Sequence, residues 1–280
     1  MPDKPQYRSG YSSETTDALR QLCLLVATRI GDLMPRIRVV GGRVPALLIN
    51  PRLPDEKEIH IGTTDLDLGI ELAVLEKKYY QEISKRLRQA GLQNDVTETG
   101  NPTRQRWTTP SNELTIDFLI PPASGEDEAG TLQDLEGDFA AVVTPGLEFA
   151  FRDFAVLELE GKTPEGDHAT RRIWVCGPGA FVILKSLALH SRGEPKDAYD
   201  LHYTLAHWPD GLDDIVERID KLPKNEIIRE AIEYLESDFS AIDSIGPQKV
   251  DRFLGGEEAD DEELRADVSG LVLEFCRRIS

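Results

Sequence analysis

Three aspartates lie in segments whose other residues are mostly apolar. Asp65 and Asp67 are two residues apart in TTDLDLGIEL (residues 63–72), and Asp117 lies in LTIDFLI (residues 114–120). Side chains at i and i+2 of a β-strand project from the same face, so the first two carboxylates would repel each other unless a cation lay between them. Mg²⁺ and Mn²⁺ prefer oxygen ligands. We therefore predict that all three aspartates bind metal, provided that the two strands are neighbours.

This interpretation has alternatives. The aspartates could lie at strand ends in solvent, and an Asp-x-Asp pair also occurs in glycosyltransferases and in calcium-binding loops. Three converging carboxylates are, however, the usual basis of a two-metal phosphoryl-transfer site, in which the metals activate an attacking hydroxyl and hold the in-line oxygens. Asp117 favours this interpretation because burying a carboxylate in an apolar strand is costly unless it is paired or bound to metal.

Two adjacent glycines precede the Asp-x-Asp pair. Gly41 and Gly42 lie between a β-like run, RIRVV (residues 36–40), and a helix-like run, RVPALLI (residues 43–49). Glycines at such a position let the backbone approach a ligand closely, and the N-terminus of the following helix favours phosphate. A tight turn without a ligand is the alternative.

A third group of charged residues lies in a helical region. Lys185 and Arg192 are seven residues apart and therefore share a helix face. Lys196, Asp197 and Asp200 follow in KDAYDL, after a break at Gly-Glu-Pro. Lys185 and its neighbours could meet phosphate, or they could form an ordinary surface ion-pair cluster.

The pattern of apolar residues predicts the elements that position these groups. We expect an α+β fold in which a mixed sheet is flanked by helices and is followed by a helical C-terminal region. The domains would be residues 1–176 and 177–280. The expected helices are 14–33, 75–92, 180–192 and 196–207, with helical structure from 212 onward. The expected strands are 36–40, 59–72, 104–109, 113–120, 147–151, 154–161 and 171–175, with a polar, acidic loop from 121 to about 138.

Composition limits the function further. The chain has 280 residues, a formal net charge of −19 and 40% hydrophobic residues, which is typical of a globular protein. The negative charge disfavours tight, constitutive nucleic-acid binding, although residues 77–89 and 103–107 are locally basic. The three cysteines, Cys23, Cys176 and Cys276, have no spacing typical of a disulfide framework or a zinc site. No apolar run is long enough to cross a membrane, so we expect a cytoplasmic protein.

The order of these motifs resembles the nucleotidyltransferase superfamily with the DNA polymerase β-like fold. More narrowly, it is similar to the AbiEii/MenT-type toxins of type IV toxin–antitoxin systems. The motifs are the glycine turn, the Asp-x-Asp pair, a later aspartate in a strand, and the helical segment from Lys185 to Leu201. The resemblance covers roughly residues 36–205. This sequence departs from the family in two ways: 22 residues separate Gly42 from Asp65, more than is usual, and Gly42 replaces a common serine.

The resemblance implies an enzyme that transfers a nucleoside monophosphate from a triphosphate to an acceptor hydroxyl. The metal ligands would be Asp65, Asp67 and Asp117, and Asp117 would also help to deprotonate the acceptor. The nucleotide-binding residues would be Gly41, Gly42, Thr64, Lys185, Arg192 and Asp197, and Lys185 would act in catalysis by neutralising triphosphate charge. The cofactor would be Mg²⁺ or Mn²⁺, with ATP as one candidate substrate. The acceptor would be a tRNA 3′ end or a protein, and an antitoxin would be a partner.

Two other functions stay open. A catalytically inactive module of the same fold would bind a nucleotide or dock an antitoxin without turnover. A glycosyltransferase would use the Asp-x-Asp pair, but it would not explain the glycine turn or KDAYDL.

Overall fold

The computed structural model describes residues 5–54, 59–71, 77–97, 99–111, 114–123 and 127–279. Within these residues the chain divides into two compact units. The first unit contains Ser13–Arg43 and Thr63–Cys176, and the second contains Val44–Gly62, Gly177–Ser280 and a short N-terminal segment that ends at Ser12. The division into domains 1–176 and 177–280, which we predicted from the sequence, stays a prediction.

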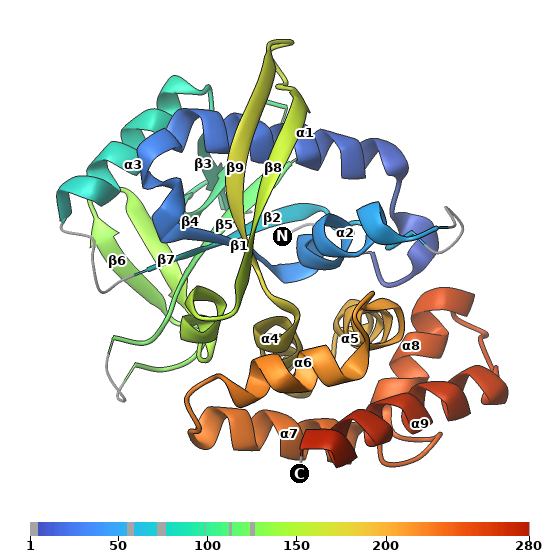
Figure 1. Cartoon of the computed structure of the whole chain (residues 1–280). Coiled ribbons are helices and arrows are strands. Elements are labelled where there is room, and N and C mark those ends of the chain that lie inside the picture. The colour runs from blue at the N-terminus through green and yellow to red at the C-terminus, as the bar shows by residue number, and fades with distance from the viewer. Residues whose placement is uncertain are drawn as a thin grey trace. The chain divides into compact units, whose positions relative to one another are not determined.

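The first unit is built around a mixed sheet of nine strands (Figure 1). The strands are β1 (Ile37–Val40), β2 (Asp65–Ile70), β3 (Gln93–Val96), β4 (Pro102–Thr108), β5 (Thr115–Ile120), β6 (Leu132–Glu136), β7 (Phe139–Val143), β8 (Phe154–Lys162) and β9 (His168–Cys176). Their order is β3-β4-β5-β2-β1-β9-β8, and β7 pairs with both β5 and β6. The pairs β2–β5, β5–β7 and β1–β9 are parallel, whereas the remaining pairs are antiparallel.

Two helices of the first unit, α1 (Ser13–Ile30) and α3 (Lys77–Gln89), lie side by side along the sheet in Figure 1. The buried residues of α1 include Leu19, Leu22, Val26 and Ile30, which recur at helical spacing. Burial of this apolar stripe stabilises the helix on the sheet.

The second unit is mainly helical. Its helices are α2 (Val44–Leu48), α4 (Pro178–Arg192), α5 (Pro195–His207), α6 (Gly211–Asp220), α7 (Glu226–Asp238), α8 (Ile245–Gly255) and α9 (Glu262–Ile279). Helix α5 packs against α4 and α8, and α4 also packs against α7. The predicted α+β fold class, with a mixed sheet, flanking helices and a helical C-terminal region, is therefore confirmed. Among the described residues, no helix is both long and apolar enough to cross a membrane.

Several predicted boundaries change. The strand expected over 59–72 begins only at Asp65, because the backbone N–H groups of His60 and Ile61 bond to the side chains of Asn50 and Tyr199 rather than to a strand. Its expected end at residue 72, the expected helix start at residue 75 and the expected strand start at residue 113 lie outside the described residues.

Two further predictions are wrong. Residues 147–151 form a single 3₁₀ turn, because Gly146 has a left-handed backbone conformation that ends the extended path. The expected acidic loop contains β6, whose partner is the buried β7, which the sequence pattern did not reveal.

Candidate functional site

The carboxylates of Asp65, Asp67 and Asp117 converge on one face of the sheet, and we call them the carboxylate cluster. Strands β2 and β5 pair in parallel, with Asp67 directly opposite Asp117. Asp65 precedes Asp67 by two residues and so projects from the same face. One oxygen of each carboxylate lies within 4.8 Å of the others. The two strands are therefore the neighbours that the metal prediction required.

Apolar residues between the aspartates hold the two strands in register. Leu66, Leu68, Ile116 and Phe118 alternate with the acidic positions, and each is at most 1% exposed. A one-residue slip of either strand would move these side chains to the opposite face. Burial of the apolar face thus fixes where the carboxylates lie.

Thr63 orients the first carboxylate. Its hydroxyl donates a hydrogen bond of 2.6 Å to Asp65 Oδ1, and both side chains are buried. This bond holds one carboxylate oxygen in place just before β2 begins. Thr63 was not among the predicted site residues; its neighbour Thr64 was, and Thr64 is half-buried.

Gly41 makes room for the second carboxylate. Its φ of +67° is rarely adopted by residues with a side chain. A Cβ atom at this position would overlap Asp67 Oδ2 and lie 2.8 Å from Asp67 Cγ. The first glycine of the predicted turn is therefore required by the carboxylate cluster. The expected helix after the turn, α2, has only 5 residues, so its contribution to phosphate binding through a helix dipole would be small.

Arg106 on β4 forms a two-point ion pair with Asp117. Arg106 Nε donates a hydrogen bond of 2.7 Å to Asp117 Oδ1, and Nη2 donates another to Oδ2. The pair is largely buried, with the side chains 12% and 13% exposed. Asp117 raises the pKa of Arg106 through these bonds, against the opposing effect of burial, and the charges of Asp65 and Asp67 act in the same direction as Asp117. Sequence reasoning noted the basic run around Arg106 but did not connect it to the cluster.

The carboxylate cluster fits a divalent cation. It offers only oxygen ligands, which Mg²⁺ and Mn²⁺ prefer. Three carboxylates this close repel one another, and the guanidinium of Arg106 offsets one of the three negative charges. A divalent cation bound between them would offset the other two.

A second charged group lies on α4 and α5, and we call it the buried ion-pair network. Lys185 Nζ is 2.7 Å from a carboxylate oxygen of Asp197 and 2.7 Å from one of Asp200. Lys196 also pairs with Asp200, and Arg192 pairs with Asp197 at 2.6 Å. The side chain of Arg192 is 52% exposed, whereas Lys185, Asp197 and Asp200 are buried. The structure thus places Lys185 inside the second unit, in contact with two buried carboxylates.

His60 belongs to this network, although it comes from the long segment between Gly42 and Asp65. Its Nε2 atom is 2.8 Å from Asp200 Oδ1, and its ring stacks on Tyr199 and meets Tyr203 edge-on. Asn50 accepts hydrogen bonds from the His60 backbone N–H and from the Tyr203 hydroxyl. The described part of the long segment is therefore packed on α5. Sequence reasoning missed His60, because only the fold brings it to Asp200.

Burial and neighbouring charges set the protonation states of the network. Burial and the charge of Lys196 lower the pKa of His60 to about 4, against the effect of Asp200, so His60 is neutral at pH 7. Burial opposes the ionisation of Asp200, but the charges of Lys185 and Lys196 outweigh it and lower its pKa. Burial would also lower the pKa of Lys185, but the charges of Asp197 and Asp200 raise it overall. Neutral His60 therefore donates from Nε2 to an ionised Asp200.

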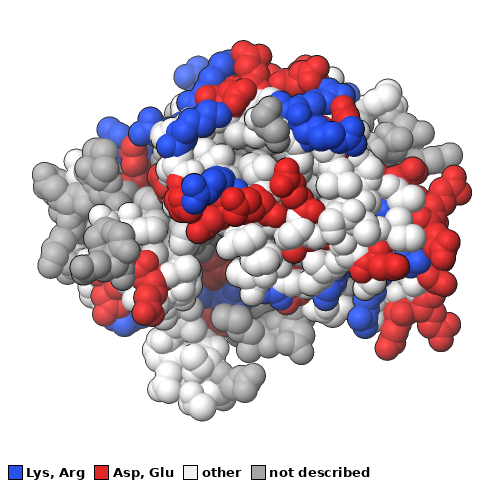
Figure 2. Space-filling model, turned by 90° about the horizontal axis from the view of Figure 1, so that it is seen from below, with Lys and Arg blue, Asp and Glu red and all other residues white. Residues whose placement is uncertain are grey.

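Several described side chains of the locally basic segments have acidic partners. Arg86 pairs with Asp32 and Glu82, and Arg88 pairs with Asp138. On the face shown in Figure 2, Lys and Arg side chains lie in small groups beside Asp and Glu. The described part of that face has no broad basic surface of the kind that binds a nucleic-acid backbone.

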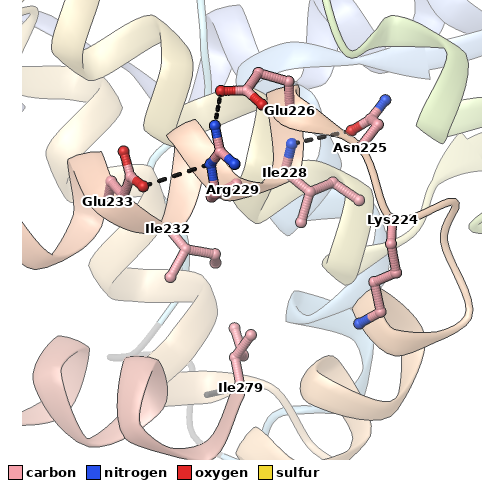
Figure 3. Close-up of a pocket in the computed structure, with 8 residues that line it drawn as sticks. All are labelled: Lys224, Asn225, Glu226, Ile228, Arg229, Ile232, Glu233 and Ile279. Carbon is pink, nitrogen blue, oxygen red and sulfur yellow. Dashed lines mark hydrogen bonds and ion pairs between the residues drawn. The ribbon is translucent and has the colours of Figure 1, made fainter.

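A hollow of about 470 Å³ lies at the N-terminal half of α7 and the end of α9. Figure 3 shows the side chains that line it: Lys224, Asn225, Glu226, Ile228, Arg229, Ile232, Glu233 and Ile279. Three of its charged residues pair with one another, because Arg229 meets Glu226 and lies 3.6 Å from Glu233, whereas Lys224 pairs with Asp220 outside the lining. None of the predicted site residues lines this hollow.

Comparisons with known proteins find likeness in structure but not in sequence. No protein-family model matches the chain, and no curated protein matches it. A structure of a candidate nucleotidyltransferase from H. pylori is similar over 96% of this chain and 97% of its own, at 14% identity and a TM-score of 0.43. A structure of the STING-associated CdnE c-di-GMP synthase from Capnocytophaga granulosa is similar over 96% of this chain and 82% of its own, at 12% identity and a TM-score of 0.29. Superposition at this level is loose, so the function is argued from the site itself.

Proposed function

We propose that this protein is a divalent-metal-dependent nucleotidyltransferase. The observation that carries the proposal is the convergence of Asp65, Asp67 and Asp117, with one oxygen of each within 4.8 Å of the others. Asp65 and Asp67 would hold Mg²⁺ or Mn²⁺, and Asp117 would complete a second metal position. When bound, the metal would supply charge stabilisation to the phosphate oxygens and lower the pKa of an attacking hydroxyl.

The chain's own residues would do the rest. Thr63 keeps Asp65 oriented through its hydrogen bond, and Gly41 leaves space for the carboxylate of Asp67. In the reaction, an acceptor hydroxyl oxygen would form a bond to the α-phosphorus of a nucleoside triphosphate. The bond from that phosphorus to the bridging oxygen would break, pyrophosphate would leave, and Asp117 would help to take the hydroxyl proton.

The nucleotide would be recognised by the residues that the family resemblance names. Its triphosphate would lie along the backbone of Gly41 and Gly42, next to Thr64. The resemblance also names Lys185, Arg192 and Asp197 as nucleotide-binding residues, and these belong to the second unit. Because Lys185 already lies 2.7 Å from two carboxylates, the more exposed guanidinium of Arg192 is the better candidate for direct contact with phosphate.

The acceptor and the biological role come from the same resemblance. A tRNA 3′ end or a protein hydroxyl would accept the nucleotide, and the protein would act as the toxin of a type IV toxin–antitoxin system with an antitoxin as its partner. Paired charges in the basic segments and the net charge of −19 favour a protein acceptor, or an RNA held through few phosphates.

The test is incubation of the full chain with each α-labelled nucleoside triphosphate, Mg²⁺, and either total tRNA or a cell protein extract. We expect one macromolecule to become labelled, which identifies nucleotide and acceptor class together. Asp65→Asn and Asp67→Asn should each lower the rate about a thousandfold, because several kcal/mol of charge stabilisation would be lost.

Asp134→Asn is the matched control. Asp134 is an exposed aspartate of β6 that pairs with Arg104, so its replacement should leave the rate unchanged. Full activity in both cluster variants would rule out the proposed chemistry. Binding of a triphosphate without any transfer would instead support the inactive nucleotide-binding or antitoxin-docking module, and selective binding of a sugar nucleotide would support a glycosyltransferase.

A further inference from the structure

Arg106, Asp117 and Asp67 form a row across three neighbouring strands. The antiparallel pairing of β4 with β5 places Arg106 directly opposite Asp117. The parallel pairing of β5 with β2 places Asp67 opposite Asp117 on the other side. Asp117 therefore lies between a guanidinium and a second carboxylate, and backbone pairing holds this order.

Both oxygens of Asp117 are engaged by Arg106. Nε and Nη2 each donate to a different oxygen, in the two-point geometry that makes arginine–carboxylate pairs strong and directional. The pair is about seven-eighths buried, so water screens it poorly. A metal ion that approached Asp117 would meet a carboxylate whose charge is already compensated.

A guanidinium and a divalent cation at the same carboxylate disfavour each other. Their positive charges repel over a few ångströms, and the oxygen electron pairs that one uses are less available to the other. Nε and Nη2 of Arg106 both donate to Asp117, so among the three aspartates the described bidentate contact of this guanidinium is with Asp117. Competition between Arg106 and a metal ion would therefore act at Asp117.

We propose that Arg106 is an internal counter-cation that competes with the metal for Asp117 and so sets the metal affinity of the carboxylate cluster. Without metal, Arg106 neutralises Asp117 and limits repulsion within the cluster. With metal, Asp117 exchanges part of its contact with Arg106 for the ion. Arg106 is thus a positioning residue, and the inference rests on the proposed function only in requiring that Asp65, Asp67 and Asp117 bind metal.

The test measures Mn²⁺ binding to the full chain without nucleotide, by the electron paramagnetic resonance signal of unbound Mn²⁺. Arg106→Gln removes the charge and keeps a polar side chain. We expect its Mn²⁺ affinity to rise about tenfold over that of the unaltered protein, because one repulsive charge near a divalent ion is gone. Arg104→Gln is the matched control, since Arg104 is on the same strand but pairs with Asp134, and it should leave affinity unchanged.

A second variant, Arg106→Lys, tests the inference in case Arg106→Gln does not fold. Arg106→Lys keeps the charge but a single ammonium cannot span both oxygens as the guanidinium does. Its Mn²⁺ affinity should lie between those of the unaltered protein and Arg106→Gln. In thermal unfolding, saturating Mn²⁺ should raise the Tm of Arg106→Gln more than that of the unaltered protein, while its metal-free Tm should be lower.

The outcomes separate this inference from the proposed function. If the unaltered protein binds Mn²⁺, loses it in Asp65→Asn, and both Arg106 variants bind equally or more weakly, competition is overturned and Arg106 only holds Asp117 in place. If neither the unaltered protein nor the Arg106 variants bind Mn²⁺, the metal site itself fails, and with it the proposed function.

Discussion

The carboxylate cluster and the buried ion-pair network use the same residue types but balance their charges differently. In the network, Asp197 and Asp200 face the cations Lys185, Lys196 and Arg192, and neutral His60 donates a further hydrogen bond to Asp200. In the cluster, the described residues place three carboxylates together, and the guanidinium of Arg106 forms a two-point pair with one of them, Asp117.

This difference distinguishes aspartates that the chain itself neutralises from aspartates that can bind a cation from solution. A group whose opposite charges are all supplied by the chain needs no ligand to neutralise it, and removal of one charge leaves its partner buried and uncompensated. A group with more carboxylates than nearby cations favours a metal ion from solution. The comparison leads to four predictions, which begin with the largest expected effect.

Lys185→Met should destabilise the protein most. It would leave Asp197 and Asp200 buried without their shared cation, which costs about 3–5 kcal/mol in comparable cases. Arg192→Gln removes another cation of the network, but its side chain is 52% exposed, so the loss should be under about 1 kcal/mol. Urea unfolding measures the free energy of unfolding of both variants. Equal, small losses would mean that the network is not held by its buried charges.

Gly41→Ala should break the cluster through its geometry. The positive φ and the overlap with the Asp67 carboxylate together should cost about 2–4 kcal/mol and should weaken Mn²⁺ binding. Gly91→Ala is the control, because Gly91 has a φ of +79° with no atom within 4 Å of an added Cβ. It should cost about 1 kcal/mol and leave Mn²⁺ binding intact. Unchanged Mn²⁺ binding in Gly41→Ala would contradict the role assigned to this glycine.

Acid should weaken the network through His60. Its pKa is about 4 in the folded protein, below the ordinary histidine pKa of about 6.5, so the unfolded state binds more protons between these values. Stability is therefore present above pH 6.5 and falls as the pH drops towards 4, by about 2 kcal/mol between pH 7 and pH 5. A proton on His60 would lie beside Lys196 and Lys185, with Asp200 as the opposing charge.

The check is urea unfolding of His60→Gln over this pH range, where the slope of stability against pH should become flatter. Burial also lowers the pKa of His202 to about 4, so His202 contributes to this pH dependence in the same direction. His202→Gln should therefore remove a separate share of the slope. An unchanged slope in His60→Gln would show that His60 is not held neutral by its surroundings.

Metal binding should give the smallest effect, and only through the cluster. At Mg²⁺ concentrations tenfold above Kd, we expect stabilisation of about 1.4 kcal/mol. Asp67→Asn should abolish this increment, whereas Asp134→Asn should retain it. Differential scanning calorimetry with and without Mg²⁺ measures the increment. The same increment in Asp67→Asn would place the bound ion elsewhere in the chain.

Much of the fold could be predicted from local pattern. Helical spacing of apolar residues predicted α1, α4 and α5, and the pattern of apolar residues also predicted the strands β4 and β5. Strands β3, β6 and β7 were missed. Their partners along the sheet, rather than their own sequences, determine that they are extended.

The site was only partly predictable. The Asp-x-Asp pair and Asp117 stood out because carboxylates in apolar strands need a partner. Thr63, Arg106 and His60 could not be chosen from many similar residues, since their roles depend on atoms that are distant in sequence. Two signals were available in the sequence. A polar residue, Thr63, lies just before the Asp-x-Asp pair, and an arginine, Arg106, lies on the predicted strand that precedes the strand of Asp117.

By itself, the sequence determined that two aspartates share a strand face, that a glycine turn precedes them, and that a third carboxylate lies in another apolar strand. These follow from the two-residue period of a strand and from the cost of burying charge. Only the tertiary structure decided that Asp67 lies opposite Asp117, that Arg106 is bound to Asp117, and that Lys185 is paired within its own unit. The reason is that strand register and ion pairing depend on which segments fold against each other, and local spacing does not specify this.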